Sequence, residues 1–256
     1  MFVKSMTDIA TVTVRELRPV VREPLFLTVS LIQPLVFLGL FGPLLSGAVD
    51  ERVFGGQDAL QWFVPGILVM ISLVGTSTMG SNLLAEIQSG AHERLMVTPL
   101  TRSSLLVGRA LKEFAPLVVQ ALVIVLAALP FGFRPHLLGT VLGLLLLGVL
   151  GTGLGALSYA LAIGVRRQEG AFWGIQQTLL FPVLILSGIL LPVEVGPDWL
   201  RTVAAANPLT YVVTAERALF NGQVVAPEVV HGALAAVLVA VLGLLVGARS
   251  LRHSPV

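Results

Sequence analysis

The sequence contains no cysteine and few charged residues. Of its 256 residues, 12% are Asp, Glu, Lys or Arg, which is about half the share found in soluble domains, and 55% are hydrophobic. The absence of cysteine excludes disulfides, thiolate metal sites and a cysteine nucleophile. The four histidines are too scattered in sequence to form a metal motif: His92, His136, His231 and His253. With a mean hydropathy of +0.92, we expect an integral membrane protein without a bound metal.

Charge is also missing from the long apolar runs. A membrane-spanning helix needs roughly 20 apolar residues, so the sequence predicts an all-α protein with six transmembrane helices. Proton-driven and voltage-driven transporters generally place ionisable groups at membrane depth, so we expect any energy to come from a partner. The six runs are Pro24–Val49, Ala59–Ala85, Phe114–Phe133, Leu137–Val165, Gly170–Val193 and Gly232–Gly247, the last extending to Val229 if His231 lies at the boundary.

Motifs of soluble enzymes are absent as well. The glycine-rich stretch Gly151–Gly155 lacks the Gly-Lys-Ser/Thr ending of a phosphate-binding loop, and we interpret it as a surface for close helix packing. No nucleophile–base pair or pair of carboxylates falls within an apolar run. We therefore expect no catalytic residue on this chain. Residues 1–22 are mixed and charged, without a separate apolar core, so we expect no cleavable signal peptide. The net charge of +2 is small, and we expect no nucleic-acid partner.

The basic residues predict how the chain is oriented. The segments that share a side with both termini hold 12 of the 16 Lys and Arg residues, so the positive-inside rule places both termini in the cytoplasm. Residues 1–23 carry Lys4, Arg15, Arg18 and Arg22 among apolar residues, which is typical of a helix lying at the membrane interface. The other inside residues are Arg94, Arg102, Arg109, Lys112, Arg166, Arg167, Arg249 and Arg252, and those outside are Arg52, Arg134, Arg201 and Arg217.

The charged segment Ala85–Lys112 lies between the second and the third apolar run. Its helical periodicity predicts a short amphipathic helix, which Thr98-Pro99 ends because proline lacks the amide donor. A second helix is expected to begin near Thr101–Ser104. This cytoplasmic segment therefore has the shape of a docking element. One face of the first helix carries Leu84, Ile87, Ala91 and Leu95, and the opposite face carries Glu86, Gly90, Glu93 and Val97.

The longest outer connection, residues 194–228, predicts two short helices. They cover Trp199–Ala206 and Thr210–Phe220 and flank Asn207-Pro208, a combination that starts turns. Asn221-Gly222 is a typical helix stop. The apolar residues of both pieces favour helices that enter the outer leaflet, with Trp199 and Tyr211 at the level of the headgroups.

Three sets of residues resemble motifs of the six-span permease subunits of type-2 ABC transporters, in particular daunorubicin-resistance-like bacterial multidrug exporters. The first set, at the first span, is Arg22-Glu23-Pro24, Gln33-Pro34 and Phe41-Gly42. The second is the cytoplasmic segment Gly90–Arg102 (GAHERLMVTPLTR). The third set is Ser187-Gly188, Pro192, Pro197, Trp199-Leu200, Asn207-Pro208-Leu209-Thr210-Tyr211 and Arg217-Ala218-Leu219.

The resemblance implies one transmembrane domain over residues 1–256, in a bacterial plasma membrane. It implies a homodimer or heterodimer of permease subunits above two copies of a cytoplasmic ATPase, which bind ATP and Mg. Residues Glu86–Val97 would form the coupling helix, and residues 194–228 the re-entrant outer helices. The implied site residues are Glu86, Gly90, Glu93, Arg94, Val97, Pro99 and Arg102 for coupling, Asn207, Pro208, Tyr211 and Arg217 for the outer motif, and Gln33 and Pro34 for the first span.

The implied function is the permease of an exporter for drugs, lipids or lipid-linked glycans, whose substrate-binding residues are not readable. A membrane scaffold or sensor that recruits a partner through the same segment is an alternative, and so is an ATP-independent carrier. Glu216 and Arg217 are expected outside, either as an interfacial ion pair or with a functional role. The sequence departs from the family pattern at Ile87, Ala91, His92, Thr214 and Glu216.

Overall fold

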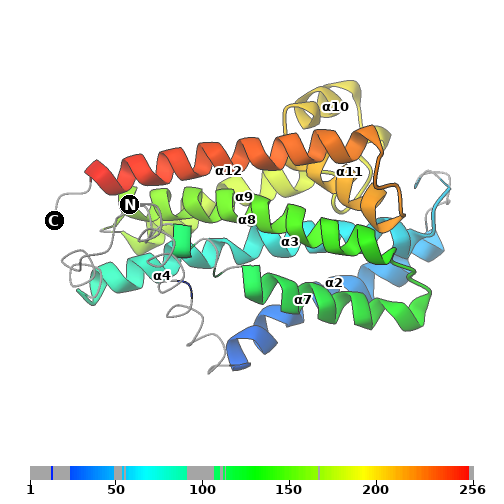
Figure 1. Ribbon diagram of the computed structural model, residues 1–256, viewed down its shortest axis with the longest axis horizontal. Helices are drawn as coiled ribbons and strands as arrows, with labels where there is room; N and C mark the ends of the chain where they lie inside the picture. Colours follow the sequence, from blue (N-terminus) through cyan, green and yellow to red (C-terminus); the bar gives the residue numbers. More distant parts are fainter. Residues whose placement is uncertain are drawn as a thin grey trace.

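The computed structural model shows an elongated bundle of helices (Figure 1). It describes residues 24–48, 56–90, 114–166 and 168–253, together with residues 13, 54, 107–109 and 112. Within these residues every regular element is helical. The elements are α2 (Pro24–Ala48), α3 (Ala59–Gly75), α4 (Ser77–Gln88), α7 (Phe114–Ala128), η2 (Leu129–Phe131), α8 (Leu137–Gly164), α9 (Glu169–Leu186), η3 (Val193–Val195), α10 (Asp198–Ala205), α11 (Pro208–Phe220) and α12 (Pro227–His253).

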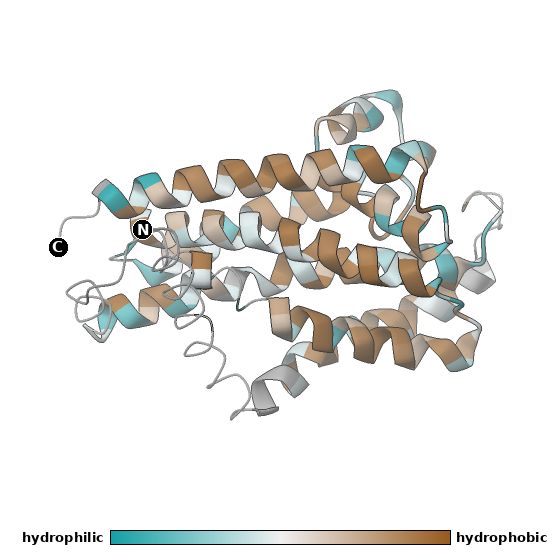
Figure 2. Ribbon diagram, viewed as in Figure 1, coloured by the Kyte–Doolittle hydropathy of each residue, from teal (hydrophilic) through white to brown (hydrophobic). Residues whose placement is uncertain are grey.

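Among the described residues, four helical stretches are long and apolar enough to cross a membrane. They are Ala59–Gln88, Val107–Phe131, Leu137–Gly164 and Pro227–Arg252. Figure 2 shows hydrophobic residues along the middle of the bundle and hydrophilic residues toward its two ends. Residues Thr28–Leu44 of α2 form a shorter apolar helix. Six spans therefore remain a prediction.

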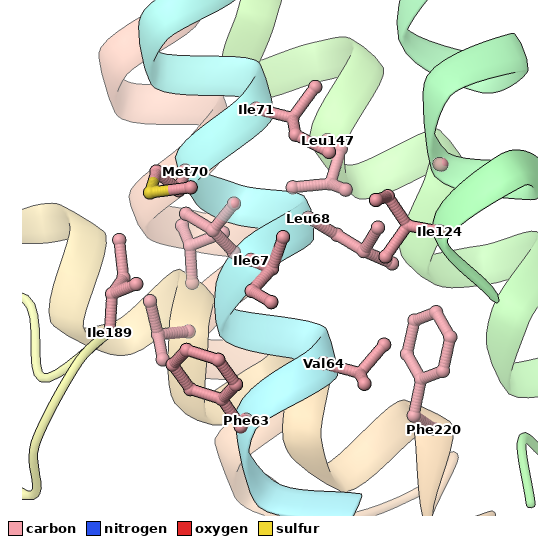
Figure 3. Packing of buried hydrophobic residues seen from close by; sticks show 14 of the residues in the cluster. Phe63, Val64, Ile67, Leu68, Met70, Ile71, Ile124, Leu147, Ile189 and Phe220 are labelled. Carbon is pink, nitrogen blue, oxygen red and sulfur yellow. The ribbon is translucent and has the colours of Figure 1, made fainter. Parts of the chain in front are cut away.

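The core is built around α3, which is apolar on all sides. A helix of this kind is buried rather than amphipathic, and Phe63, Val64 and Ile67 are fully buried. Figure 3 shows side chains of α3 surrounded by Ile124, Leu147, Ile189 and Phe220 from four other parts of the chain. Because α3 is enclosed in this way, it fixes the positions of the helices on either side of it.

Close contact between helix backbones organises the packing of α8. A Cβ atom added at Gly153 would lie 2.6 Å from the Cα atom of Ala240 in α12. A Cβ at Gly80 of α4 would lie 2.5 Å from the carbonyl oxygen of Ser158. The interpretation of Gly151–Gly155 as a packing surface is therefore confirmed, and the physical reason is that small residues let backbones approach.

Most predicted boundaries agree with the structure, but the fifth apolar run does not form a helix throughout. We predicted Gly170–Val193, whereas α9 ends at Leu186 and the chain then turns at Gly188, which has φ +70°. Glycine adopts this left-handed conformation readily because it has no Cβ atom. Two short helices are present where they were predicted, as α10 and α11, and Figure 1 places them at the opposite end of the bundle from the end of α4. Their position on the outer side remains a prediction.

Candidate functional site

The last turn of α4 carries the first of the predicted coupling residues, Glu86. Its carboxylate forms an ion pair with the guanidinium of Arg109, and the two side chains are 26% and 4% exposed. The guanidinium also lies over the ring of Tyr159 in α8, 5.7 Å from the ring centroid. Glu86 therefore joins α4 to the segment that leads into α7, and its carboxylate is directed at this chain rather than being held free for a partner.

The prediction of one coupling helix over Glu86–Val97 is wrong at its start. Helix α4 ends at Gln88, and Gly90 follows with φ +69°. The amides of Ser89 and Gly90 donate to the carbonyls of Ala85 and Ile87, which is how a left-handed glycine closes a helix. The predicted residues Glu93, Arg94, Val97, Pro99 and Arg102 lie outside the described residues, so the coupling role remains a prediction.

The outer motif begins at the junction of α10 and α11. The side-chain oxygen of Asn207 accepts a hydrogen bond of 3.1 Å from the amide of Leu209, and the amide nitrogen of Asn207 donates to the carbonyl of Val183 at 3.0 Å. Pro208 occupies the first turn of α11, where no amide donor is needed. Asn207 thus caps α11 and attaches it to α9.

The next residues of the motif continue this attachment. The Thr210 hydroxyl is 3.1 Å from the carbonyl oxygen of Leu186 and 3.0 Å from that of Ala204. The Tyr211 hydroxyl donates to the carbonyl of Ala205 at 2.9 Å, and its ring is exposed. The motif residues therefore bind backbone carbonyls of the preceding helices, which holds α9, α10 and α11 in one arrangement.

Arg217 connects α11 to the core. Its Nε atom donates to the carbonyl of Trp62 at 3.0 Å, and a terminal nitrogen donates to the carbonyl of Gly188 at 2.8 Å. The guanidinium carbon lies 3.5 Å from the centroid of the Trp62 ring, a cation–π contact. Sequence reasoning missed Trp62 as the partner, because the two residues are 155 positions apart.

Glu216 does not pair with Arg217, whose guanidinium donates to backbone carbonyls, so the alternative of an interfacial ion pair is wrong. Its side chain is fully buried, and neither carboxylate oxygen has a hydrogen-bond partner among the described residues. A Cβ at Gly143 of α8 would lie 2.4 Å from Oε2. Helix α11 is not one of the four stretches that could span a membrane, and burial raises the pKa of Glu216 to about 8. The apolar face of α11, with Val212 and Phe220, is the signal that could have predicted the burial.

The first-span motif, Gln33 and Pro34, lies apart from the residues of both the coupling segment and the outer motif. Gln33 and Pro34 of α2 line a cavity of about 160 Å³ between α2, α3, α4, α7 and α8. Gln33 is exposed and Pro34 is buried. The structure therefore brings together the residues of the outer motif, while the first-span motif belongs to a separate cavity.

Comparison with known proteins gives consistent matches over most of the chain. The family profile described as "ABC-2 type transporter" matches residues 7–221. The chain is 29% identical over 201 residues to a daunorubicin resistance ABC transporter permease protein of Streptomyces coeruleorubidus, covering 78% of this chain and 70% of that protein. It is 30% identical over 218 residues to a putative transport permease of Pyropia yezoensis, covering 84% and 74%. It is also 30% identical over 155 residues to a probable multidrug ABC transporter permease of Escherichia coli strain K12, covering 59% and 41%.

Proposed function

The chain belongs to the ABC-2 type transporter family, and on this premise we propose that it is the permease subunit of an ATP-driven exporter. The observation that carries the proposal is the family match over residues 7–221, together with relatives named as drug resistance permeases. The exported compounds are hydrophobic or amphiphilic, such as drugs, lipids or lipid-linked glycans. The path out of the cytoplasm or the inner leaflet runs along this chain.

The energy source in this proposal is a separate protein. Helices α3, α7 and α8 contain no Asp, Glu, Lys or Arg, whereas proton-coupled transporters keep such groups at membrane depth. Two copies of a cytoplasmic ABC ATPase bind ATP and Mg and dock beneath two permease subunits. The second permease is either another copy of this chain or a related one.

The proposed topology is that of a bacterial plasma membrane protein with six spans and both termini in the cytoplasm. In this topology Gly90 lies on the cytoplasmic side, and α10 and α11 lie on the outer side. Their position at opposite ends of the bundle supports the arrangement (Figure 1). The positive-inside distribution of basic residues supports it as well.

The first experiment asks whether an ABC ATPase encoded beside this gene co-purifies with the chain and forms crosslinks to residues 90–102. A stable complex with crosslinks in that segment would support the permease function. Absence of an ATPase, or crosslinks elsewhere on the chain, would favour a scaffold or a carrier. Purified chain in liposomes separates these two, because gradient-driven flux without ATPase is expected of a carrier.

A double variant tests coupling directly. Glu93→Ala with Arg94→Ala should insert normally and lower substrate-stimulated ATP turnover. The matched control is Asp198→Ala with Arg201→Ala, which removes an exposed ion pair of α10 and should leave turnover unchanged. Normal binding and cycling of the ATPase with the first variant would contradict the coupling assignment.

A further inference from the structure

Glu216 of α11 is a carboxyl group that the proposed function does not use. Its side chain is fully buried, and neither carboxylate oxygen has a hydrogen-bond partner among the described residues. An ionised carboxylate is costly to bury without a partner, so a group in such surroundings generally holds a proton instead. A buried polar group without a partner therefore needs an explanation in this protein.

The carboxyl group lies where α11 packs directly on the backbone of α8. A Cβ atom added at Gly143 would lie 2.4 Å from Oε2 of Glu216, and one added at Gly139 would lie 1.7 Å from the carbonyl oxygen of Leu219. Glycine at these two positions leaves the space that the carboxyl group and the backbone of α11 occupy. We refer to these four residues as the α8–α11 contact, which is closed when the helices are packed and open when they separate.

Two further contacts hold α11 on its other sides. A Cβ atom added at Gly232 of α12 would lie 2.3 Å from the Cβ atom of Ala215. Arg217 donates to backbone carbonyls of α3 and of the turn after α9. Because Oε2 of Glu216 lies against Gly143, separation of α11 from α8 is the movement that brings the carboxyl group to water.

The other ionisable groups around α11 are exposed or already bonded. Burial lowers the pKa of Arg217 to about 9, and its guanidinium is bonded to carbonyls. His136 is exposed and accepts a hydrogen bond from the amide of Gly139 at the start of α8. Residues 59–75, 137–158, 170–186 and 232–248 of the surrounding helices include no ionisable side chain. The remaining groups near the ends of these helices are exposed: Asp58, Glu194, Asp198, Arg201, Tyr211, Glu228 and His231.

Proton binding and closure of the α8–α11 contact are linked. Burial raises the pKa of Glu216 from 4.5 to about 8, whereas a carboxyl group that reaches water returns to its ordinary pKa. The closed contact therefore binds the proton more tightly than the open one. Opening becomes more favourable as pH rises from about 4.5 to about 8 and gains nothing further above that value.

We propose that Glu216 is a proton-binding site whose occupancy holds α11 against α8, and that loss of the proton separates the two helices. The ligand is a proton, and the part that responds is the end of the bundle formed by α10 and α11. In the topology proposed above this end faces the external medium, so the acidity of that medium sets the closed fraction. The response needs neither ATP nor a second protein, so its test is separate from that of the proposed export.

Spin labels on the full-length chain measure the distance between the two helices. The chain contains no cysteine, so labels attach only to introduced cysteines. Thr214→Cys on α11 and Val141→Cys on α8 change exposed positions. Double electron–electron resonance should give one short distance near pH 4.5 and a second, longer distance as pH rises to about 8. The ratio of open to closed should increase by about tenfold for each pH unit in this range.

Two variants change the contact itself. Glu216→Gln keeps the size of the side chain without a group that ionises, so the short distance should persist at every pH. Gly143→Ala places a Cβ atom against the carboxyl group, which destabilises the closed contact and should make the longer distance appear at lower pH. Its matched control is Gly174→Ala of α9, where an added Cβ meets nothing within 4 Å. This control should reproduce the wild-type profile.

Two more controls separate this response from other effects of pH. His136→Asn replaces the titratable cap of α8 by another capping residue and should keep the response. Labels at Val141→Cys and Leu238→Cys join α8 to α12, and their distance should not change. A single distance in wild type at every pH would overturn the proposal. So would a longer distance that survives in Glu216→Gln, a profile of Gly143→Ala equal to wild type, or a parallel change between α8 and α12.

Discussion

The two ends of the bundle are held together by different kinds of contact. At the end formed by α10 and α11, which we propose is the outer end, Asn207, Thr210 and Arg217 donate to backbone carbonyls of α9, α10, α3 and the turn at Gly188. At the other end, α4 packs on α8 through buried apolar residues that include Leu83 and Leu84, and its side-chain polar contact is the ion pair between Glu86 and Arg109. A carbonyl acceptor is fixed by its helix, whereas an ion pair between side chains can be exchanged for a pair with another protein.

This difference matches the proposed roles of the two ends. A re-entrant outer motif needs one stable arrangement. Hydrogen bonds from side chains to backbone carbonyls provide it. A docking end needs a contact that can change when a partner binds. If the proposed outer end is the more strongly fixed of the two, variants of its polar contacts should lower the free energy of unfolding more than a variant of Glu86.

The largest effect is expected for Arg217→Ala. The change leaves the carbonyls of Trp62 and Gly188 without a donor and removes the cation–π contact, so the free energy of unfolding should fall by about 3–5 kcal/mol. Unfolding in mixed micelles, followed by circular dichroism, measures it. The control Arg201→Ala removes an exposed ion pair and should cost less than about 1 kcal/mol. Equal losses in the two variants would contradict the comparison.

Glu216→Gln should change how stability depends on pH. Burial raises the folded-state pKa of Glu216 from 4.5 to about 8, so the folded state binds this proton more tightly than the unfolded state does. The contribution of this group to stability is therefore fully present below about pH 4.5 and is lost as pH rises to about 8. The variant should be more stable than wild type by roughly 4 kcal/mol near pH 8 and similar to it at low pH.

The control for this prediction is Glu228→Gln, which changes an exposed carboxylate at the start of α12. It should leave the pH profile of wild type unaltered. Thermal denaturation across the pH range measures both variants. An unchanged profile for Glu216→Gln would show that the buried carboxyl is not the group that titrates.

Asn207→Ala removes a helix cap and a hydrogen bond to α9. We expect a loss of about 2 kcal/mol in unfolding free energy, about half from each contribution. Asn207→Ser keeps a capping oxygen and loses the amide that donates to Val183, so it should cost about half as much. Chemical denaturation compares the two. If serine costs as much as alanine, the cap contributes nothing.

The smallest effect is expected for Glu86→Gln. Glu86 is 26% exposed, and glutamine keeps a side-chain oxygen that can accept a hydrogen bond from Arg109, so the change should lower the free energy of unfolding by about 1 kcal/mol. Salt should reduce the difference between variant and wild type, because screening weakens a partly exposed pair. A loss as large as that of Arg217→Ala would show that both ends are fixed to the same degree.

The parts of the fold that follow from local pattern could be predicted from the sequence. The run Leu137–Val165 is α8 (Leu137–Gly164), and the Asn-Pro and Asn-Gly signals delimit α11. The length of an uncharged run and the residues that cap a helix are local features of the sequence. The positions of these helices can therefore be predicted from the sequence alone. The packing role of Gly153 could also be predicted from the sequence, because small residues in an apolar helix generally serve close helix packing.

The contacts that define the sites could not be predicted in the same way. Arg217 and Trp62 meet because α11 packs on α3, and Gln120 meets Ser30 because α7 packs on α2. Such pairs depend on the arrangement of helices, which periodicity does not determine. Glu216 stands next to Arg217 in the predicted outer connection, which suggests an interfacial ion pair. The structure shows that its own face of α11 is apolar.

Helices α3 and α4 follow each other almost without a break from Asp58 to Gln88, and their joint length can be compared with the thickness of a membrane. Residues Ala59–Gln88 form a stretch of 30 residues, and a rise of about 1.5 Å per residue makes it about 45 Å long. A bilayer measures about 40–45 Å when its headgroup layers are included. The acidic residues at the two ends of this helix therefore stand at opposite surfaces of such a membrane. A thinner membrane would have to tilt the helix, and the contacts at Trp62 and Glu86 would tilt with it.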